Sequence, residues 1–307
     1  MNKIVVLGSS NTDLVVRTPR MPLPGETILG GDFLIAAGGK GANQAVAVAR
    51  LGTPVTFIAK LGTDMFGDTA VAHYAAEGID TSTILRDAAA PSGVALITVD
   101  DRGENCIVVA GGANNSLTVA DVEAMRSHIE GAEYLLMQLE VPMKTIERAA
   151  EIAHAAGVKV IVNPAPAAKL SDALLSRCYL LTPNETECGI LTAAEVTDAA
   201  SAERAAEQLL TKGVQNVIVT LGSKGALYKS AAETELIPAY SVRAVDTTAA
   251  GDTYNGALCV ALSEGRDMRA AVEFATRASA ISVTRAGAQP SLPTRAEVDD
   301  FDAAKYR

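Results

Sequence analysis

The feature that most constrains the fold is the alternation of short apolar runs with amphipathic stretches along the chain. The apolar runs have the length of buried strands, and they lie at residues 4–7, 55–58, 134–139, 158–162, 179–182 and 217–221. The amphipathic stretches have helical spacing and lie at residues 42–51, 68–77, 118–130, 143–156, 199–212, 253–264 and 268–284. This order predicts an α/β fold in which helices cover both faces of a mostly parallel central sheet.

Two regions interrupt this alternation. Residues 14–36 contain prolines, glycines and β-prone segments without helical spacing, and residues 92–110 have the pattern of a hairpin with a turn near Asp101 to Gly103. We expect a single domain over residues 1–307, in which these two excursions form a small β-sheet lid over a site. The alternative is an ordinary peripheral β-ribbon.

Composition excludes several classes of protein. The formal net charge of −10 disfavours binding to nucleic acid or to an anionic membrane, since both require clustered positive charge. Four cysteines without a CxxC pair predict free, buried thiols rather than a disulfide framework or a zinc site. No apolar run reaches about 18 residues, and the first residues lack a signal-peptide pattern, so we expect a cytoplasmic protein.

Polar and glycine-rich motifs follow the predicted strands. Residues 8–13 (GSSNTD) come directly after the first strand, where ligands bind in parallel α/β sheets. Asn11 and Asp13 offer the donors and acceptors that suit vicinal hydroxyls, although a turn with side-chain capping has the same composition. In residues 37–44 (AGGKGANQ), three glycines allow the backbone to approach a ligand closely. This segment matches neither the P-loop nor the dinucleotide-binding pattern.

The most informative motif is residues 246–253 (DTTAAGDT), before a predicted helix. The tight Ala-Ala-Gly turn can direct N–H groups at a phosphate, and Asp252 is placed to accept a proton. The alternative is that Asp252 only caps the helix. Residues 184–187 (NETE) could bind Mg²⁺ through water or cap a helix, and residues 220–225 (TLGSKG) could lie along phosphates or form a hairpin turn.

Together these motifs resemble, in order and spacing, the ribokinase family of carbohydrate kinases, over about residues 3–293. The resemblance lies in residues 38–43 (GGKGAN), 184–187, 220–225 and 246–252. Residues 8–13, 138–140 (QLE) and 286–291 (AGAQPS) further resemble the members that phosphorylate ribose. The resemblance implies the three-layer fold with a β-lid, and direct transfer of a phosphoryl group from ATP to a sugar.

The resemblance also implies roles for the matched positions. Asp252 would take the proton from the primary hydroxyl. The residues around the sugar would be Asn11, Thr12, Asp13, Gly39, Lys40, Gly41, Ala42, Asn43, Glu140 and Asp252. ATP would bind to Asn184, Thr220, Leu221, Gly222, Ser223, Lys224, Gly225, Gly251, Asp252 and Thr276, where Thr276 replaces a histidine frequent in relatives. Mg²⁺ would lie near Asn184 and Glu187, and an activating K⁺ near Asp246, Thr248, Ser282, Arg285, Gly287 and Ser291.

The expected sugar site also bears on the substrate. Its three carboxylates, Asp13, Glu140 and Asp252, would repel a phosphorylated sugar, and the chain has few aromatic residues to stack on a nucleoside base. A neutral pentose fits best. Asn11 beside Asp13 favours D-ribose, phosphorylated at its 5-hydroxyl, over 2-deoxyribose or another neutral sugar. A non-catalytic sugar sensor would have lost Asp252 or the glycines, and both are present.

The exposed edges of the lid predict that two copies of the chain pair as a homodimer.

Overall fold

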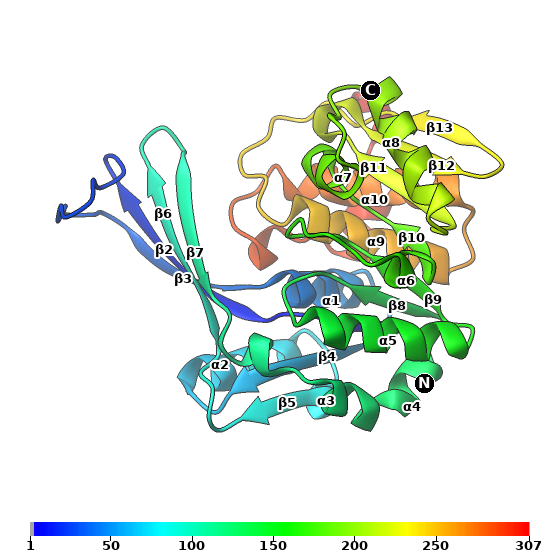
Figure 1. Cartoon of the computed structure of the whole chain (residues 1–307). Coiled ribbons are helices and arrows are strands. Elements are labelled where there is room, and N and C mark those ends of the chain that lie inside the picture. Colours follow the sequence, from blue (N-terminus) through cyan, green and yellow to red (C-terminus); the bar gives the residue numbers. More distant parts are fainter. Residues whose placement is uncertain (1–2, 307) are drawn as a thin grey trace.

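A nine-stranded sheet forms the centre of the computed structural model, which describes residues 3–306 (Figure 1). The strand order is β13-β12-β11-β10-β9-β8-β1-β4-β5. The strands are β1 (Ile4–Leu7), β4 (Val55–Gly62), β5 (Ile84–Asp87), β8 (Tyr134–Met137), β9 (Lys159–Val162), β10 (Cys178–Leu181), β11 (Asn216–Thr220), β12 (Ala226–Ser230) and β13 (Thr234–Ile237). Pairing is parallel from β11 through β5, and β12 and β13 add an antiparallel edge. The predicted mostly parallel sheet is confirmed.

Strand β1 shows why the strands have continuous apolar sequences. Ile4 pairs with Val55 of β4 on one side and with Tyr134 of β8 on the other. Ile4 and Val6 belong to one hydrophobic cluster, whereas Val5 and Leu7 belong to a second cluster on the opposite face. Because successive side chains point to opposite faces, a strand buried on both faces requires an apolar residue at every position.

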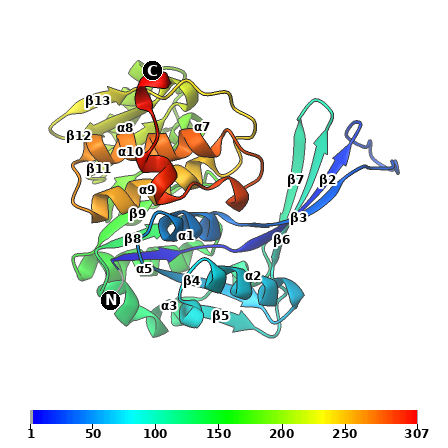
Figure 2. The same cartoon turned by 180° about the vertical axis from the view of Figure 1, so that it is seen from behind.

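Helices cover both faces of this sheet and complete the three layers (Figures 1 and 2). The first face carries α1 (Lys40–Arg50), α2 (Met65–Ala76), α9 (Ala250–Ser263), α10 (Met268–Ser282) and α11 (Arg295–Asp299). The second face carries α3 (Val119–Ala124), α4 (Arg126–Glu130), α5 (Met143–Ala155), α6 (Asp172–Leu175), α7 (Glu185–Thr192) and α8 (Ala199–Thr211). The short 3₁₀ helices are η1 (Thr81–Thr83), η2 (Gly112–Ser116), η3 (Gly222–Lys224), η4 (Gln289–Ser291) and η5 (Ala303–Lys305).

Three predicted helices differ from the observed ones. Helix α2 begins at Met65, three residues before the predicted start at 68, because the Asp64 side chain caps it. The stretch 118–130 is two helices, because the chain turns at Met125 between α3 and α4. Helix α9 begins at Ala250, three residues before the predicted start at 253, because Ala249 adopts a left-handed conformation with φ of 59° and precedes the first turn. The earlier start places Gly251 and Asp252 within the first turn of α9.

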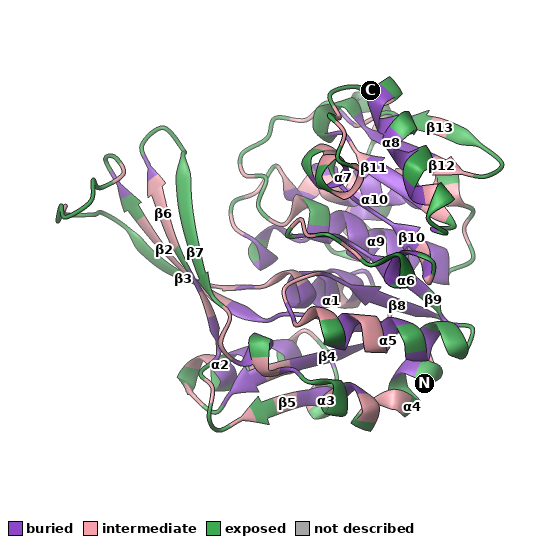
Figure 3. Ribbon diagram, viewed as in Figure 1, coloured by how far each residue is buried: buried purple, intermediate pink, exposed green. Residues whose placement is uncertain are grey.

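The predicted second sheet is also present. It has the order β3-β2-β6-β7 and consists of β2 (Asn11–Thr18), β3 (Phe33–Gly38), β6 (Gly93–Asp100) and β7 (Asn105–Ala110). This sheet extends away from the body, and its outer strands are largely exposed (Figures 1 and 3). Strand β2 begins at Asn11 rather than near residue 14. Asn11, Thr12 and Asp13 therefore belong to the second sheet, whereas residues 8–10 connect β1 to β2.

Two expectations concern thiols and membranes. Cys178, Cys188 and Cys259 are buried free thiols, as expected, but the free thiol of Cys106 is exposed because β7 has no covering layer. Within residues 3–306, no helix has the length and apolar character needed to span a membrane.

Candidate active site

Asp252 is buried at the start of α9, and its carboxylate is held by side chains of α1. Asn43 donates from Nδ2 to Oδ2 over 2.9 Å, and Gln44 donates from Nε2 to Oδ1 over 3.0 Å. Burial raises the pKa of Asp252, while Lys40 and these two amides oppose the rise. The position before α9 is Ala249, and it makes no side-chain cap. The alternative that Asp252 caps the helix is therefore wrong.

The glycines at the start of α1 allow this helix to approach the end of β1. Gly39 has a φ of 89°, which an L-residue rarely adopts, and a Cβ at Gly41 would overlap the backbone of Gly8 and Ser9. Ala42 donates its N–H to Ser9 O over 2.8 Å, and its side chain is buried in the core. Ala42 therefore contributes backbone alone to this region, and the tight approach brings Asn43 and Gln44 to Asp252.

Lys40 lies among four carboxylates at the same point. Burial disfavours its charge, but Asp252, Glu140, Glu187 and Asp13 together raise the pKa of the Lys40 ammonium. The Lys40 N–H donates to Glu140 Oε2 over 3.1 Å, and Ser9 Oγ donates to the same oxygen over 2.5 Å. The structure thus brings residues from β2, α1, the segment after β8 and α9 around one ammonium group.

Asn11 and Asp13 lie on one face of β2, while Thr12 points to the opposite face because side chains alternate along a strand. A Cβ at Gly38 would overlap the Asp13 carboxylate, so the carboxylate lies against the backbone of β3. The pKa of Asp13 is raised to about 6, first by burial and then by the negative charge of Glu140. Of the ten predicted sugar residues, Thr12 and Ala42 direct their side chains elsewhere.

A small cavity of about 210 Å³ opens beside Asp252. Its lining combines predicted residues, Lys40, Asn184, Glu187, Gly251 and Asp252, with three polar residues that the sequence reasoning missed, namely Asn163, Thr182 and Asn255. Asn163 accepts from Gln44 Nε2 over 3.1 Å, and Thr182 donates to Asn255 Oδ1 over 2.6 Å. Asn163 and Thr182 directly follow β9 and β10, so the rule that ligands bind at carboxyl ends of strands would have found them.

A larger cavity of about 700 Å³ adjoins the small one. The two share Asn184, Thr220, Thr247, Ala250 and Gly251. Gly222, Ser223, Gly225 and Thr276 line the larger cavity, as do the unpredicted residues Ala239, Tyr240, Ser241 and Val242. Leu221 instead lies in the core, and Lys224 Nζ donates to Glu185 Oε1 over 3.1 Å. The hairpin-turn interpretation of residues 220–225 is confirmed, because the turn joins the antiparallel strands β11 and β12. The same turn also lines the larger cavity, and its contact with phosphates stays a prediction.

Asn184 and Glu187 cap a helix, which was one of the two roles considered. Asn184 Oδ1 accepts the N–H of Glu187 over 2.8 Å, and Glu187 Oε2 accepts the N–H of Asn184 over 2.9 Å, which is a capping box. Burial raises the pKa of Glu187. Within the described residues, its other carboxylate oxygen accepts no hydrogen bond, and Glu187 lines the small cavity. Within residues 3–306, no cluster of three acidic, histidine or cysteine side chains could hold a metal by itself.

Asp246 joins the two loops of the predicted potassium site. Its Oδ1 accepts from the N–H and hydroxyl of Thr248 over 2.9 and 2.7 Å, and its Oδ2 accepts from the Gly287 N–H over 2.8 Å. Burial opposes this charge, but the hydrogen bonds lower the pKa of Asp246. Ser282 and Ser291 are buried and donate to Ser279 O and Ala288 O. The Arg285 guanidinium pairs with Glu297, so only its backbone could face a cation.

A deep nucleotide-sized cavity beside a buried carboxylate, at the carboxyl ends of parallel strands, is the arrangement of a phosphoryl-transfer enzyme. The chain belongs to the pfkB family of carbohydrate kinases, whose model matches residues 1–295. Among its relatives, ribokinase of Haemophilus influenzae is 48% identical, with 97% of each chain covered. Deoxyribokinase of Salmonella typhi is 37% identical, with 97% of this chain and 98% of that chain covered.

Solved structures agree with this assignment of the family. Ribokinase from Thermotoga maritima has a TM-score of 0.90 and 40% identity, with 97% of this chain and 98% of that chain covered. Arabidopsis thaliana ribokinase, solved in complex with ribose and ATP, also has a TM-score of 0.90, with 32% identity and coverage of 98% and 99%. The fold predicted from the resemblance, including its second sheet, is confirmed.

Proposed function

We propose that the protein transfers the γ-phosphoryl group of ATP to the 5-hydroxyl of D-ribose, giving ribose 5-phosphate and ADP. The main support is the position of Asp252. Asp252 lines the small cavity, it is close enough to Asp13 to affect the pKa of that carboxyl, and its neighbour Gly251 lines both cavities. A sugar hydroxyl in the small cavity would have a proton acceptor on one side and ATP on the other.

The sugar site combines acceptors with few donors. Asp13, Glu140 and Asp252 accept hydrogen bonds from hydroxyls, and Asn11 and Asn43 are neutral. This set suits an uncharged polyol and disfavours a substrate that already bears phosphate. The two excursions that form the second sheet would cover the sugar and exclude water, which limits hydrolysis of ATP.

The transfer step uses positioning and electrostatics. Asp252 takes the proton of the 5-hydroxyl while the hydroxyl oxygen forms a bond to the γ-phosphorus. The bond from this phosphorus to the β–γ bridging oxygen breaks at the same time. The first N–H groups of α9 have no acceptor within the helix. The Ala250 N–H donates to Thr247 O over 3.2 Å, so the Gly251 N–H is the one that would face the transferring phosphoryl group. The Lys40 ammonium lines the same cavity and adds positive charge.

ATP would lie in the larger cavity, with its base toward Thr276 and Tyr240 and its phosphates toward Gly222, Ser223 and Gly251. Mg²⁺ would lie beside Asn184 and Glu187, mostly through water, as few carboxylates suit this ion. When bound, it would neutralise phosphate charge. The free carboxylate oxygen of Glu187 in the small cavity supports this assignment.

A bound K⁺ would lie between the loops that Asp246 joins. The donor set fits, since it offers one carboxylate and the backbone carbonyls near Thr248, Ser282, Arg285, Gly287 and Ser291. These loops flank the residues before α9, so an ion there would set the shape of the turn at Ala249. Potassium would then act through the protein and not on the substrate.

Two copies of the chain would associate through the second sheet. The support is a group of exposed apolar side chains on it, Phe33, Leu34, Ile35, Leu96, Ile107, Val108 and Val109. Sedimentation of the purified protein tests the dimer, and a monomer at micromolar concentration would contradict it.

We also propose that the reaction takes place in the cytoplasm, where free thiols such as Cys106 persist.

The test of the proposed function is an ATP-consumption assay over pentoses, hexoses and nucleosides. We expect the highest kcat/KM for D-ribose and a product phosphorylated at the 5-position. 2-Deoxyribose is the second candidate acceptor, because one of the relatives is named deoxyribokinase. A hydrogen bond to the 2-hydroxyl predicts at least about tenfold preference for ribose. A higher value for 2-deoxyribose would overturn the choice of ribose but not the kinase activity.

A further inference from the structure

The side chain of Asn114 lies behind the sugar site and contacts the start of β2. Asn114 belongs to η2, the short helix that follows the last strand of the second sheet, and it is only 2% exposed. Its Oδ1 accepts from the Ser10 N–H over 2.9 Å, and its Nδ2 donates to Ser10 O over 3.0 Å and to Asn11 Oδ1 over 2.8 Å. These contacts join residues that are more than 100 positions apart in the sequence.

The contacts fix the orientation of two amide groups in turn. A backbone N–H can only donate and a backbone carbonyl can only accept, so Ser10 determines which end of Asn114 carries oxygen and which carries nitrogen. The Asn114 nitrogen then faces Asn11, and the Asn11 atom that meets it has to be the acceptor, Oδ1. The Asn11 Nδ2 therefore faces away from Asn114. Within residues 3–306, the hydrogen bond that the Asn11 side chain makes is the one that its Oδ1 accepts from Asn114.

Neither amide has room to change its position. A Cβ at Gly93 would overlap both Asn11 Oδ1 and Asn114 Nδ2, so the pair is packed against the backbone of β6. Ala113, beside Asn114, donates its N–H to Pro91 O over 2.7 Å. Asn114 is thus held by the backbone before β2 and at the start of β6, and Asn11 is held by Asn114.

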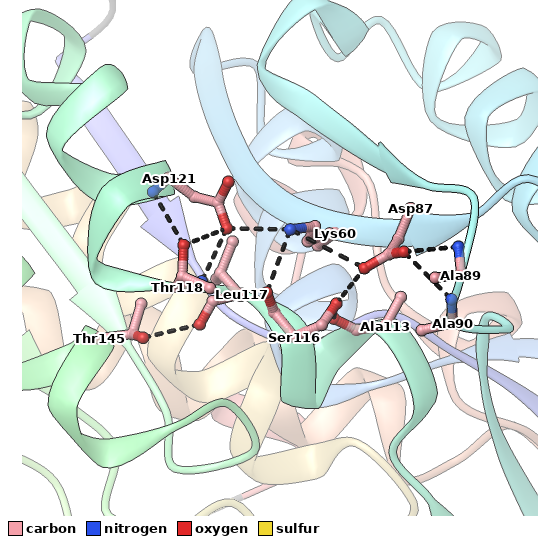
Figure 4. A network of polar contacts seen from close by, with 10 residues as sticks. All are labelled: Lys60, Asp87, Ala89, Ala90, Ala113, Ser116, Leu117, Thr118, Asp121 and Thr145. Carbon is pink, nitrogen blue, oxygen red and sulfur yellow. Dashed lines mark hydrogen bonds and ion pairs between the residues drawn. The ribbon is translucent and has the colours of Figure 1, made fainter.

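A network of charges anchors η2 to the body (Figure 4). Lys60 Nζ on β4 donates to Ser116 O over 3.1 Å and to Asp121 Oδ2 over 3.0 Å. Ser116 Oγ donates to Asp87 Oδ2 over 2.5 Å, and hydrogen bonds from Ser116, Ala89 and Ala90 lower the pKa of Asp87 to about 2. The network fixes the turn that presents Asn114, so Asn114 is a rigid support and not a mobile side chain.

We propose that Asn114 is a positioning residue for sugar recognition, which rests on the proposed function. It orients Asn11 so that the amide N–H groups, and not the carbonyl oxygen, face the sugar. Asn11 then offers donors beside the acceptor Asp13 on the same face of β2. One hydroxyl of the sugar accepts from Asn11 while its neighbour donates to Asp13, so the site reads two vicinal hydroxyls with opposite polarity.

The first test compares Asn114→Ala with Asn115→Ala. Asn115 is exposed on the same turn and has no part in these contacts, so it is a matched control. With Asn114 shortened, Asn11 can rotate its amide. We expect the Kd for ribose, measured by calorimetry without ATP, to rise on the order of tenfold. KM for ribose should rise alike, whereas KM for ATP stays within twofold, a split that general destabilisation would not produce. Asn115→Ala should match the wild type in all three values.

The second test, Asn11→Asp, does not depend on the fold tolerating a shortened Asn114. A carboxylate at position 11 keeps an oxygen to accept from Asn114 Nδ2, replaces the outward N–H groups by an acceptor oxygen, and adds a negative charge beside Asp13. We expect ribose binding to weaken by at least about tenfold. If Asn11 offered its oxygen to the sugar, this variant would bind ribose as well as the wild type does, and the proposal would be wrong.

Failure of the proposal for Asn114 can be distinguished from failure of the proposed function. A wild-type protein that does not phosphorylate ribose would contradict the proposed function alone, and the variants would then be compared on the best acceptor of the sugar panel. Equal Kd values for that acceptor in wild type and folded Asn114→Ala would overturn the role of Asn114.

Discussion

Gln44 Nε2 donates to Asp252 Oδ1 over 3.0 Å, although 208 positions separate the two residues. Asn43, the preceding residue of α1, donates to the other carboxylate oxygen. Gln44 is itself held by Gln138, which donates to Gln44 Oε1 over 2.5 Å. Both oxygens of the proposed base therefore accept hydrogen bonds that favour its charged form, and these bonds oppose the rise in pKa caused by burial.

Gln44→Met should change the pH dependence of catalysis. Removal of a donor to the charged carboxylate raises the pKa of Asp252 further, so less of the base is deprotonated at low pH. We expect the acid limb of the profile of kcat against pH to shift to higher pH by roughly one unit. The control is Gln208→Met on the exposed side of α8. An unchanged acid limb in Gln44→Met would show that this bond does not tune the base.

Asp13→Asn should stabilise the ligand-free protein near neutral pH and abolish sugar binding. The native pKa of Asp13 is about 6 and its ordinary value is 3.8, so the native state binds more protons between these values. The free energy of unfolding therefore falls as pH rises from about 4 to 6, and the loss persists above pH 6. The neutral amide avoids this cost, which we expect to be roughly 1–3 kcal/mol at pH 7.5.

Denaturant unfolding at pH 7.5 and at pH 4 measures this effect. The gain from Asp13→Asn should be present at pH 7.5 and nearly absent at pH 4. The matched substitution Asp32→Asn, at an exposed carboxylate between β2 and β3, should change neither value. A variant that is less stable than the wild type at pH 7.5 would contradict the interpretation that the buried charge of Asp13 destabilises the ligand-free protein.

Gly251→Ala should preserve the fold and impair ATP use. A Cβ at Gly251 meets no protein atom within 4 Å, and Ala is a better helix former than Gly. The same methyl group would enter the space shared by the two cavities, where we place the phosphates. We expect kcat/KM for ATP to fall by at least about tenfold. Gly31→Ala, at another glycine with room for a methyl group, should have normal kinetics.

Potassium should activate the enzyme. We expect kcat to rise when KCl replaces tetramethylammonium chloride at one ionic strength. Asp246→Asn should remove most of this rise in kcat, because Asp246 supplies the one negatively charged ligand among the residues proposed to hold the ion. Equal rates in both salts would contradict the assignment of the loops joined by Asp246 to a cation site.

Most of the fold could be predicted from the sequence, because strands buried on both faces have continuous apolar runs. Strand β1 has the predicted bounds, and the other five predicted strands overlap observed ones. Strand β5 was not predicted, since its sequence Ile84 to Asp87 includes two charged residues and lies at the sheet edge. The division between α3 and α4 was missed because the helical spacing continues through Met125.

The site was predicted only where its residues form local motifs. Gly39, Lys40, Gln44, Gly251 and Asp252 are part of such motifs, whereas Asn114 acts through contacts with residues more than 100 positions away. Single polar residues of this kind leave no pattern in one sequence. The lining from Ala239 to Val242 was missed for a similar reason, since that segment has neither strand nor helix periodicity.

The most direct test of the central claim is kcat of Asp252→Asn with ribose and ATP. If Asp252 accepts the proton of the 5-hydroxyl, kcat should fall by about 10²–10⁴-fold, because the amide has no basicity. The KM values for ribose and ATP should change far less, since the loss falls on the transition state. Circular dichroism should show a folded variant. A folded variant with kcat within about threefold of the wild type would contradict the assignment of Asp252 as the base.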